Sequence, residues 1–134
     1  MKRSILVMMV CLIAVFNVAG QGINFFKGNY QEALAKAAET NKMVFIDFYT
    51  EWCGPCKMMA KEVFTDKSVG EYYNGKFIAI QLNAEDPANK AVVKQFKISA
   101  YPTLAYVRSD GKVVLQKTGS MSIEEFLKQG KVAT

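Results

Sequence analysis

Two cysteines three positions apart, Cys53 and Cys56, are the residues of this 134-residue chain whose spacing best suits chemistry. A disulfide across so short a loop constrains little of the unfolded chain, so a purely structural role explains the pair poorly. A structural zinc site needs four ligands, usually Cys and His, and the chain has no histidine and one further cysteine, Cys11. Redox chemistry of the thiol pair is therefore the favoured interpretation, and it requires neither a metal nor a cofactor.

The composition excludes several other kinds of chemistry. Without histidine, Ser-His-Asp and Cys-His catalysis are ruled out, and a carboxylate, Lys, Tyr or Cys must carry any proton. The formal charge is +5, but the basic residues are scattered and form no patch of the kind that binds nucleic acid. With 51% hydrophobic residues, the chain has ample material for one packed domain.

Residues 1–20 have the layout of a secretory signal peptide. Two basic residues precede an apolar run from Ile5 to Phe16, and small residues follow up to Gly20. The run is shorter than the roughly 20 residues that cross a bilayer, which argues against a retained anchor. We therefore expect cleavage near Gly20, loss of Cys11 with the leader, and one exported, periplasmic domain over residues 21–134.

The rest of the pattern predicts helices alternating with strands. Capping boxes at Asn29 and Ser122 mark two helix starts, and Asp86 followed by proline marks a third. Long apolar runs are typical of strands buried on both faces, and Asp110-Gly111 indicates a hairpin. The predicted helices cover 30–40, 57–64, 66–73 (a turn or two), 87–96 and 123–128, and the predicted strands cover 43–49, 77–82, 103–108 and 113–117.

The order of these elements predicts an α/β fold. The early strands are separated by helices and are expected to run parallel, and the hairpin adds an antiparallel pair. The result is a central mixed β-sheet flanked by helices on both faces.

The segment Trp52-Cys53-Gly54-Pro55-Cys56-Lys57 resembles the active site of the thioredoxin family, and the resemblance covers essentially all of residues 21–134. It also rests on Asp47 in the preceding strand, on Tyr101-Pro102-Thr103, and on Gly119 after the hairpin. The resemblance implies a thioredoxin fold, a cis peptide bond before the proline of the second segment, and a position for Gly119 beside the active-site surface.

The position of the cysteines at the start of a helix indicates which of them is the nucleophile. A thiol at a helix N-terminus meets the helix dipole and unpaired backbone N–H groups, which favour the thiolate. We therefore assign Cys53 as the exposed nucleophile and Cys56 as the more buried thiol that resolves the mixed disulfide. Gly54 and Pro55 let the loop hold the sulfurs within bonding range, and Lys57 is a solvated residue that adds positive charge nearby.

Asp47 is the one acid in an apolar strand. Desolvation there is expected to raise its pKa, which suits a proton shuttle for Cys56. The alternative is a buried acid that only satisfies local hydrogen bonds. Thioredoxins commonly have a lysine near this acid, whereas the matching position here is Gln81. Without that positive charge, we expect the pKa of Asp47 to rise further.

Three more residues are expected to contact substrate. Trp52, the only tryptophan, is assigned to a docking surface, the alternative being a buried core aromatic. The resemblance places Pro102 against the sulfurs, with the Tyr101 backbone free to pair with an incoming peptide as an added strand. Tyr101 replaces the smaller aliphatic residue usual in thioredoxins, which bears on substrate choice or redox poise.

The leading functional hypothesis is a reductase of protein disulfides in the cell envelope. Gly-Pro between the cysteines is the dipeptide of reductive thioredoxins, whereas strong oxidants of this fold carry a histidine there. The stretch Val63-Phe64-Thr65-Asp66 resembles exported thioredoxin-like domains, including the terminal domain of membrane electron-transfer proteins. The expected partners are disulfide-bearing envelope proteins as substrates and a membrane thiol carrier as reductant, with the protein itself a monomer.

Three alternatives stay open. An oxidase or isomerase would suit an oxidising envelope. A cytochrome c maturation thioredoxin usually carries an extra element between strand and helix, for which this chain has no room. The domain could also be a non-catalytic binding subunit whose thiols are incidental, since fold alone does not fix function.

Overall fold

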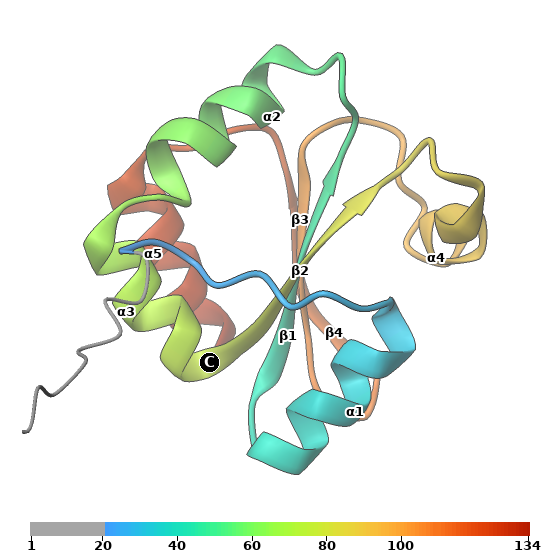
Figure 1. Ribbon diagram of the computed structural model, residues 1–134, viewed down its shortest axis with the longest axis horizontal. Helices are drawn as coiled ribbons and strands as arrows, with labels where there is room; N and C mark the ends of the chain where they lie inside the picture. The colour runs from blue at the N-terminus through green and yellow to red at the C-terminus, as the bar shows by residue number, and fades with distance from the viewer. Residues whose placement is uncertain (1–20) are drawn as a thin grey trace, which may run out of the picture.

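The computed structural model describes residues 21–134, so the predicted signal peptide, with Cys11, lies outside the described residues. Within that range one four-stranded sheet, in the order β2-β1-β3-β4, runs through the middle of the molecule (Figure 1). β1 pairs in parallel with β2 and antiparallel with β3, and β3 pairs antiparallel with β4. The predicted mixed sheet is confirmed. Its strands are β1 (Met43–Tyr49), β2 (Phe77–Asn83), β3 (Thr103–Val107) and β4 (Val113–Thr118).

Helices cover both faces of this sheet, as predicted (Figure 1). One face carries α1 (Tyr30–Thr40) and α4 (Lys90–Gln95), the latter preceded by the short 3-10 helix η2 (Pro87–Asn89). The other face carries α2 (Gly54–Met58), the π-helical turn η1 (Met59–Val63), α3 (Lys67–Lys76) and α5 (Ile123–Ala133).

The core consists of two apolar layers, one on each side of the sheet. Successive side chains of a strand point to opposite faces, so β1 contributes to both layers. Ile46 and Phe48 pack under α1 and α4, whereas Phe45 packs under α3 and α5. The same alternation places Asp47 on the Phe45 face, which is the face that α2 covers.

Local sequence signals fix the helix starts. The capping boxes at Asn29 and Ser122 are both formed, and Asp86 caps η2 by accepting a hydrogen bond from the Ala88 N–H. Such caps satisfy backbone N–H groups that have no partner inside the helix. These predicted starts are therefore confirmed.

Two helices are longer than predicted, and each continues through a glycine. α3 covers ten residues, and α5 continues past Lys128 to Ala133. A Cβ at Gly130 of α5 would lie 2.9 Å from the Tyr73 ring of α3, so the glycine lets the two helices approach closely. Tertiary packing thus overrides the low helix propensity of glycine.

The helix that follows the cysteines begins earlier than predicted, at Gly54 instead of Lys57. After Met58 it widens into the π-helical turn η1, closed by a hydrogen bond from the Phe64 N–H to the Met59 carbonyl oxygen. Single π-helical turns within helices occur frequently at functional sites.

The hairpin between β3 and β4 forms around Gly111, which has a positive φ of 91°. The Arg108 N–H donates to the Lys112 carbonyl oxygen, which leaves a three-residue loop over 109–111. β3 ends at Val107, one residue before the predicted end, because the chain turns there.

The segment that precedes α1 packs along the outer edge of β2. Phe25 forms a parallel bridge with Ala79, and the Ile23 N–H donates to the Phe64 carbonyl oxygen. A Cβ at Gly70 would lie 2.4 Å from the Gln21 carbonyl oxygen, so this glycine permits the close approach.

Between residues 21 and 134, no helix has the length and apolar character needed to cross a membrane.

Candidate active site

Cys53 and Cys56 form a disulfide at the start of α2, with their Cα atoms 5.3 Å apart. Cys53 is the N-cap residue of this helix, and its sulfur accepts a hydrogen bond of 3.1 Å from the Cys56 N–H. Gly54 and Pro55 form the first turn between them, as predicted. When the bond is reduced, the N–H groups of this turn favour the thiolate form of Cys53.

The expected difference in exposure between the two cysteines is wrong. Both are buried, with 4% of each residue exposed. The disulfide closes a small ring with the loop, so the first sulfur is drawn inward with the second. What separates the two residues is their surroundings. Cys53 caps the helix, whereas Cys56 lines a pocket beneath it.

Asp47 lies on β1 and is 1% exposed. Its Oδ2 accepts a hydrogen bond of 3.1 Å from Nε2 of Gln81, the residue directly opposite on β2. Burial raises the pKa of Asp47 to about 7, and the Gln81 hydrogen bond acts in the opposite direction. The expectation of a raised pKa is confirmed, with desolvation as the main cause.

A pocket of about 360 Å³ joins Asp47, Gln81, Cys56 and Lys57. The buried carboxyl and the second cysteine thus line one cavity. Thr50 also lines this pocket and was not singled out from the sequence. Its buried hydroxyl has no hydrogen-bond partner within residues 21–134, and neither does Oδ1 of Asp47.

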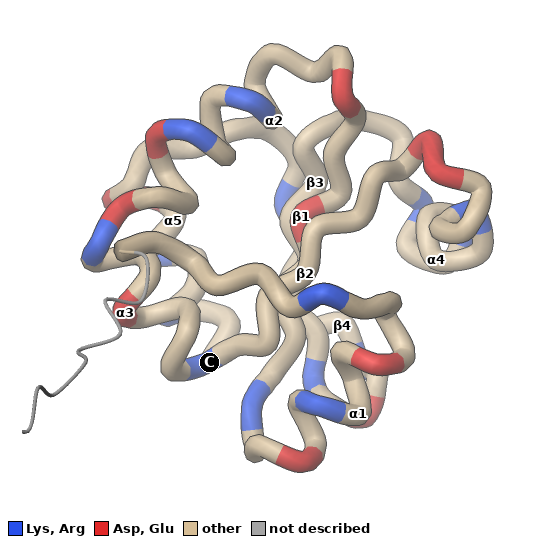
Figure 2. The backbone as a smooth tube through the Cα atoms, in the orientation of Figure 1, with Lys and Arg blue, Asp and Glu red and all other residues tan. Residues whose placement is uncertain are grey.

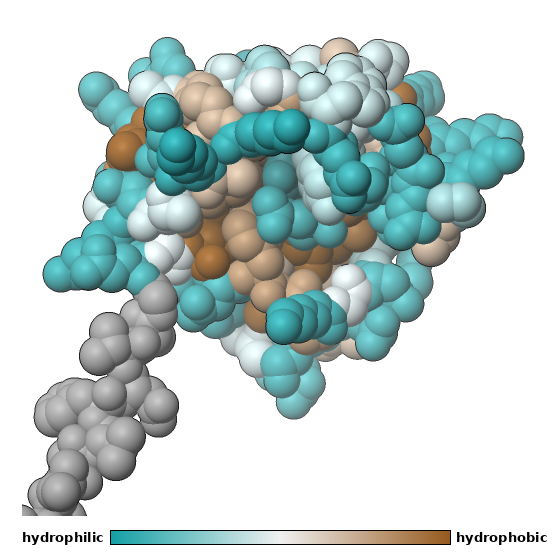
Figure 3. All heavy atoms as spheres, turned by 45° about the horizontal axis from the view of Figure 1, so that its top comes forward, coloured by the Kyte–Doolittle hydropathy of each residue, from teal (hydrophilic) through white to brown (hydrophobic). Residues whose placement is uncertain are grey.

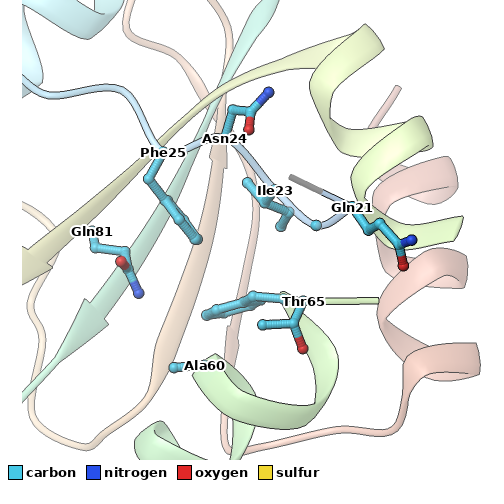
Figure 4. A pocket seen from close by; sticks show the side chains of 9 residues that line it. Gln21, Ile23, Asn24, Phe25, Ala60, Thr65 and Gln81 are labelled. Carbon is cyan, nitrogen blue, oxygen red and sulfur yellow. The ribbon is translucent and has the colours of Figure 1, made fainter. Parts of the chain in front are cut away.

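A second pocket, of about 380 Å³, adjoins the first, because Gln81 and Ala60 line both. Figure 4 shows the Gln81 side chain on one side of it, with the segment from Gln21 to Phe25 along another. Gln81 therefore separates the Asp47 pocket from the segment that precedes α1.

The Tyr101–Pro102 peptide bond is cis, as the resemblance implied. The Pro102 carbonyl oxygen accepts a hydrogen bond of 2.8 Å from the Gly119 N–H. Gly119 has a positive φ of 101°, a conformation that favours glycine, so its position at the end of β4 supports the proline loop.

Trp52 is 67% exposed, which excludes the alternative of a buried core aromatic. Its ring meets the Tyr101 ring edge-on with centroids 5.9 Å apart, and its indole N–H donates to the Glu85 carboxylate. Glu85 lies in the loop between β2 and η2 and was missed, because nothing in its local sequence points toward a tryptophan 33 positions away.

Comparisons with known proteins agree with this geometry. A family model described as a thioredoxin-like domain matches residues 30–133, so the chain belongs to the thioredoxin-like family. A thioredoxin of Chlorobaculum thiosulfatiphilum is 33% identical over 99 residues, which cover 70% of this chain and 86% of that protein. The chain is therefore a thioredoxin-like thiol–disulfide oxidoreductase with Cys53–Cys56 as its cysteine pair.

Solved structures give the same fold. A proposed disulphide-isomerase from Bacteroides thetaiotaomicron has a TM-score of 0.75 and 36% identity, covering 86% of this chain and 95% of that one. The oxidised C-terminal domain of Neisseria meningitidis DsbD has a TM-score of 0.66 and 26% identity, covering 77% and 90%. The chain spans about a fifth of the length of the plant protein disulfide-isomerases that it also matches.

Proposed function

We propose that this protein is an exported reductase of protein disulfides in the cell envelope, released from its signal peptide near Gly20. The observation that carries the direction of the reaction is the pair Gly54 and Pro55 between the cysteines. Neither side chain can donate a hydrogen bond to the Cys53 sulfur. In this fold, strong stabilisation of the reduced form makes an oxidant, so its lack favours a reductant.

The reaction begins when the Cys53 thiolate attacks one sulfur of the substrate disulfide. That S–S bond breaks, one substrate thiolate leaves, and a mixed disulfide with Cys53 forms. The Cys56 thiol then gives its proton to the Asp47 carboxylate and attacks the Cys53 sulfur. The second substrate thiolate leaves, and the two electrons of the dithiol have passed to the substrate.

Asp47 suits this proton transfer because its pKa of about 7 lies close to neutral pH. The substrate is held by the exposed Trp52 ring and by the backbone of Tyr101, with which an extended peptide pairs as an added strand. The disulfide is reduced again by a membrane thiol carrier, and the protein acts as a monomer.

Isomerisation of disulfides is the second candidate function. Its support comes from the names of two relatives, the Bacteroides thetaiotaomicron protein and the Datisca glomerata protein disulfide-isomerase, the latter 28% identical over 93 residues. An isomerase needs a less reducing cysteine pair than a reductase does. The reduction potential of the cysteine pair therefore distinguishes the two functions.

The test is the reduction potential of the Cys53–Cys56 pair in glutathione or dithiothreitol buffers, read from Trp52 fluorescence. A reductase requires a value of about −250 mV or lower, close to that of thioredoxin. A value of about −150 mV or higher would exclude the reductase and support the isomerase or an oxidase.

Export is tested separately by expressing the full chain in a bacterial host and determining the N-terminus of the protein. Cleavage after Gly20 gives a mature chain that begins at Gln21. An intact N-terminus on cytoplasmic protein would refute export.

A further inference from the structure

Asn74 and Gly75, in the last turn of α3, form the only Asn-Gly pair in the chain. Asparagine loses its side-chain amide most readily before glycine, because glycine has no Cβ to hinder attack by its own backbone nitrogen. Gly75 is exposed, and a Cβ built on it would meet nothing within 4 Å, so its surroundings are open. Neither residue belongs to the cysteine site.

The Asn74 side chain is held at both of its polar atoms by the segment that precedes α1. Its Oδ1 accepts a hydrogen bond of 2.9 Å from the Asn24 N–H, and its Nδ2 donates one of 3.1 Å to the Gly22 carbonyl oxygen. The Asn74 carbonyl oxygen also accepts a hydrogen bond of 2.7 Å from Nζ of Lys42. One amide thus pairs with two backbone groups of the segment, while a third bond holds the backbone of Asn74 itself.

The segment of residues 21–25 is closely seated where it meets Asn74. A Cβ at Gly22 would lie 2.2 Å from the Phe64 carbonyl oxygen, which accepts the Ile23 N–H over 2.8 Å. In Figure 2 the tube of this segment is tan, since its residues carry no charged side chain. Figure 3 shows hydrophobic side chains in a hollow beside the grey atoms, where the segment begins. Docking of segment 21–25 therefore depends on apolar contacts and a few hydrogen bonds, two of which Asn74 makes.

Loss of the amide from an Asn-Gly pair follows a redox-neutral path. The backbone nitrogen of Gly75, after losing its proton, attacks Cγ of Asn74. The bond from Cγ to Nδ2 breaks, and Nδ2 leaves as ammonia. Water then opens the five-membered imide at one of its two carbonyls, which gives aspartate or isoaspartate with one new negative charge. For the attack, the Asn74 amide must turn toward the Gly75 nitrogen, so both hydrogen bonds to segment 21–25 have to break first.

We propose that Asn74–Gly75 is a deamidation site which the docked segment 21–25 keeps closed, and that reaction there releases the segment. The amide of asparagine donates to the Gly22 carbonyl oxygen, whereas aspartate has no donor and brings a negative charge against that oxygen. The product therefore cannot remake the contact, and the release is irreversible. Segment 21–25 also lines the pocket that adjoins the Asp47 pocket, so its release changes the outer wall of the redox site.

The test compares wild type with Gly22→Ala, in which the new Cβ cannot fit against Phe64 and displaces segment 21–25. Both folded proteins are incubated at mildly alkaline pH, and conversion of Asn74 is followed by peptide mapping with mass spectrometry. We expect conversion to be about tenfold faster in Gly22→Ala, as when hydrogen bonds of ordinary strength no longer oppose the opening. Adding Gly75→Ala must abolish this gain, because its Cβ hinders the attacking nitrogen.

Equal rates in wild type and Gly22→Ala, or a gain that survives Gly75→Ala, would overturn the inference. Asn89 of η2 is an internal control in the same peptide maps. Equal acceleration at Asn89 would mean that Gly22→Ala loosens the whole fold, and it would overturn the protective role of the segment.

A second variant tests the release and does not depend on the folding of Gly22→Ala. Asn74→Asp carries the carboxylate of the product from the start. The backbone amides of Ile23 and Asn24 must exchange with solvent deuterium faster than in wild type, while those of β1 keep their wild-type rates. Unchanged exchange at Ile23 and Asn24 would refute the release of the segment, and equal acceleration in β1 would refute its local character.

Discussion

At the scale of single residues, burial brings the pKa of Asp47 close to neutral pH. Its pKa is about 7 in the folded protein, against an ordinary value of 3.8. Between these two values, the folded protein holds a proton that the unfolded chain has released. The contribution of Asp47 to the free energy of unfolding therefore falls as pH rises from about 4 to about 7, and this contribution is constant above that range.

This dependence gives a stability prediction. Denaturant titrations of the oxidised protein should show it less stable at pH 8 than at pH 5, by roughly 2–3 kcal/mol. Asp47→Asn removes the titrating group and should make the two values nearly equal. The cysteines do not titrate while they are bonded, so they do not interfere. A wild-type protein with the same stability at both pH values would contradict a buried Asp47 with a raised pKa.

The different surroundings of the two cysteines predict different trapping behaviour. Cys56→Ser leaves the nucleophile without its resolving partner, so a mixed disulfide with substrate should accumulate at Cys53. Cys53→Ser should accumulate far less, because Cys56 faces the inner pocket. Non-reducing electrophoresis and mass spectrometry identify the bonded cysteine. The reverse pattern would exchange the two assignments.

The sequence predicts the role of a residue only where neighbouring residues in the chain carry the pattern. Cys53 and Cys56 lie in one short motif, and Asp47 stands out as an acid among apolar neighbours. The contact of Glu85 with Trp52 joins two separate loops, and Thr50 lines the pocket that contains Asp47; no local pattern encodes either fact. The exposure of Cys53 was mispredicted because it depends on the disulfide that ties its sulfur to that of Cys56.

At the scale of elements, the glycines inside helices account for the main errors in length. The predicted helix ended at Lys128, shortly before Gly130, and glycine often follows the last turn of a helix. The helix continues because this glycine lies against the Tyr73 ring. Caps were predicted well, because a capping residue and its partner are three positions apart in sequence.

The two helical glycines Gly130 and Gly75 form a matched pair. Gly130→Ala places a Cβ 2.9 Å from the Tyr73 ring and should destabilise the protein by about 1–3 kcal/mol, as overpacking does. An alanine at Gly75 meets nothing within 4 Å and should be neutral or stabilise by up to about 1 kcal/mol. Thermal or chemical unfolding measures both. Equal changes in stability would mean that the contact with Tyr73 does not determine the cost of an alanine at Gly130.

At the scale of the whole molecule, the sheet separates two cores. Phe126 contacts Phe45, Phe64 and Tyr73 on one side, whereas Phe96 contacts Tyr30 and Phe48 on the other. The nearly continuous apolar run of β1 predicted that both faces would be filled. The strand order and register came only from the structure, because they depend on pairing between segments distant in the chain.

Within residues 21–134 no aromatic contact joins the two cores, so the losses of stability from substitutions in each should add. Phe126→Leu and Phe96→Leu should each destabilise the protein, and the double variant should lose their sum within about 0.5 kcal/mol. Unfolding of the single and double variants in denaturant measures the coupling. A coupling above about 1 kcal/mol would show that strain passes through the sheet.

This separation has a consequence for how such a chain can change over generations. The disulfide, Asp47 and the π-helical turn all lie on one side of the sheet, with the core that contains Phe45. The layer under α1 and α4 includes neither the cysteines nor Asp47. In a selection that demands redox activity, the substitutions in surviving variants should therefore concentrate in that layer. Its sequence can then change during evolution while the redox activity is kept.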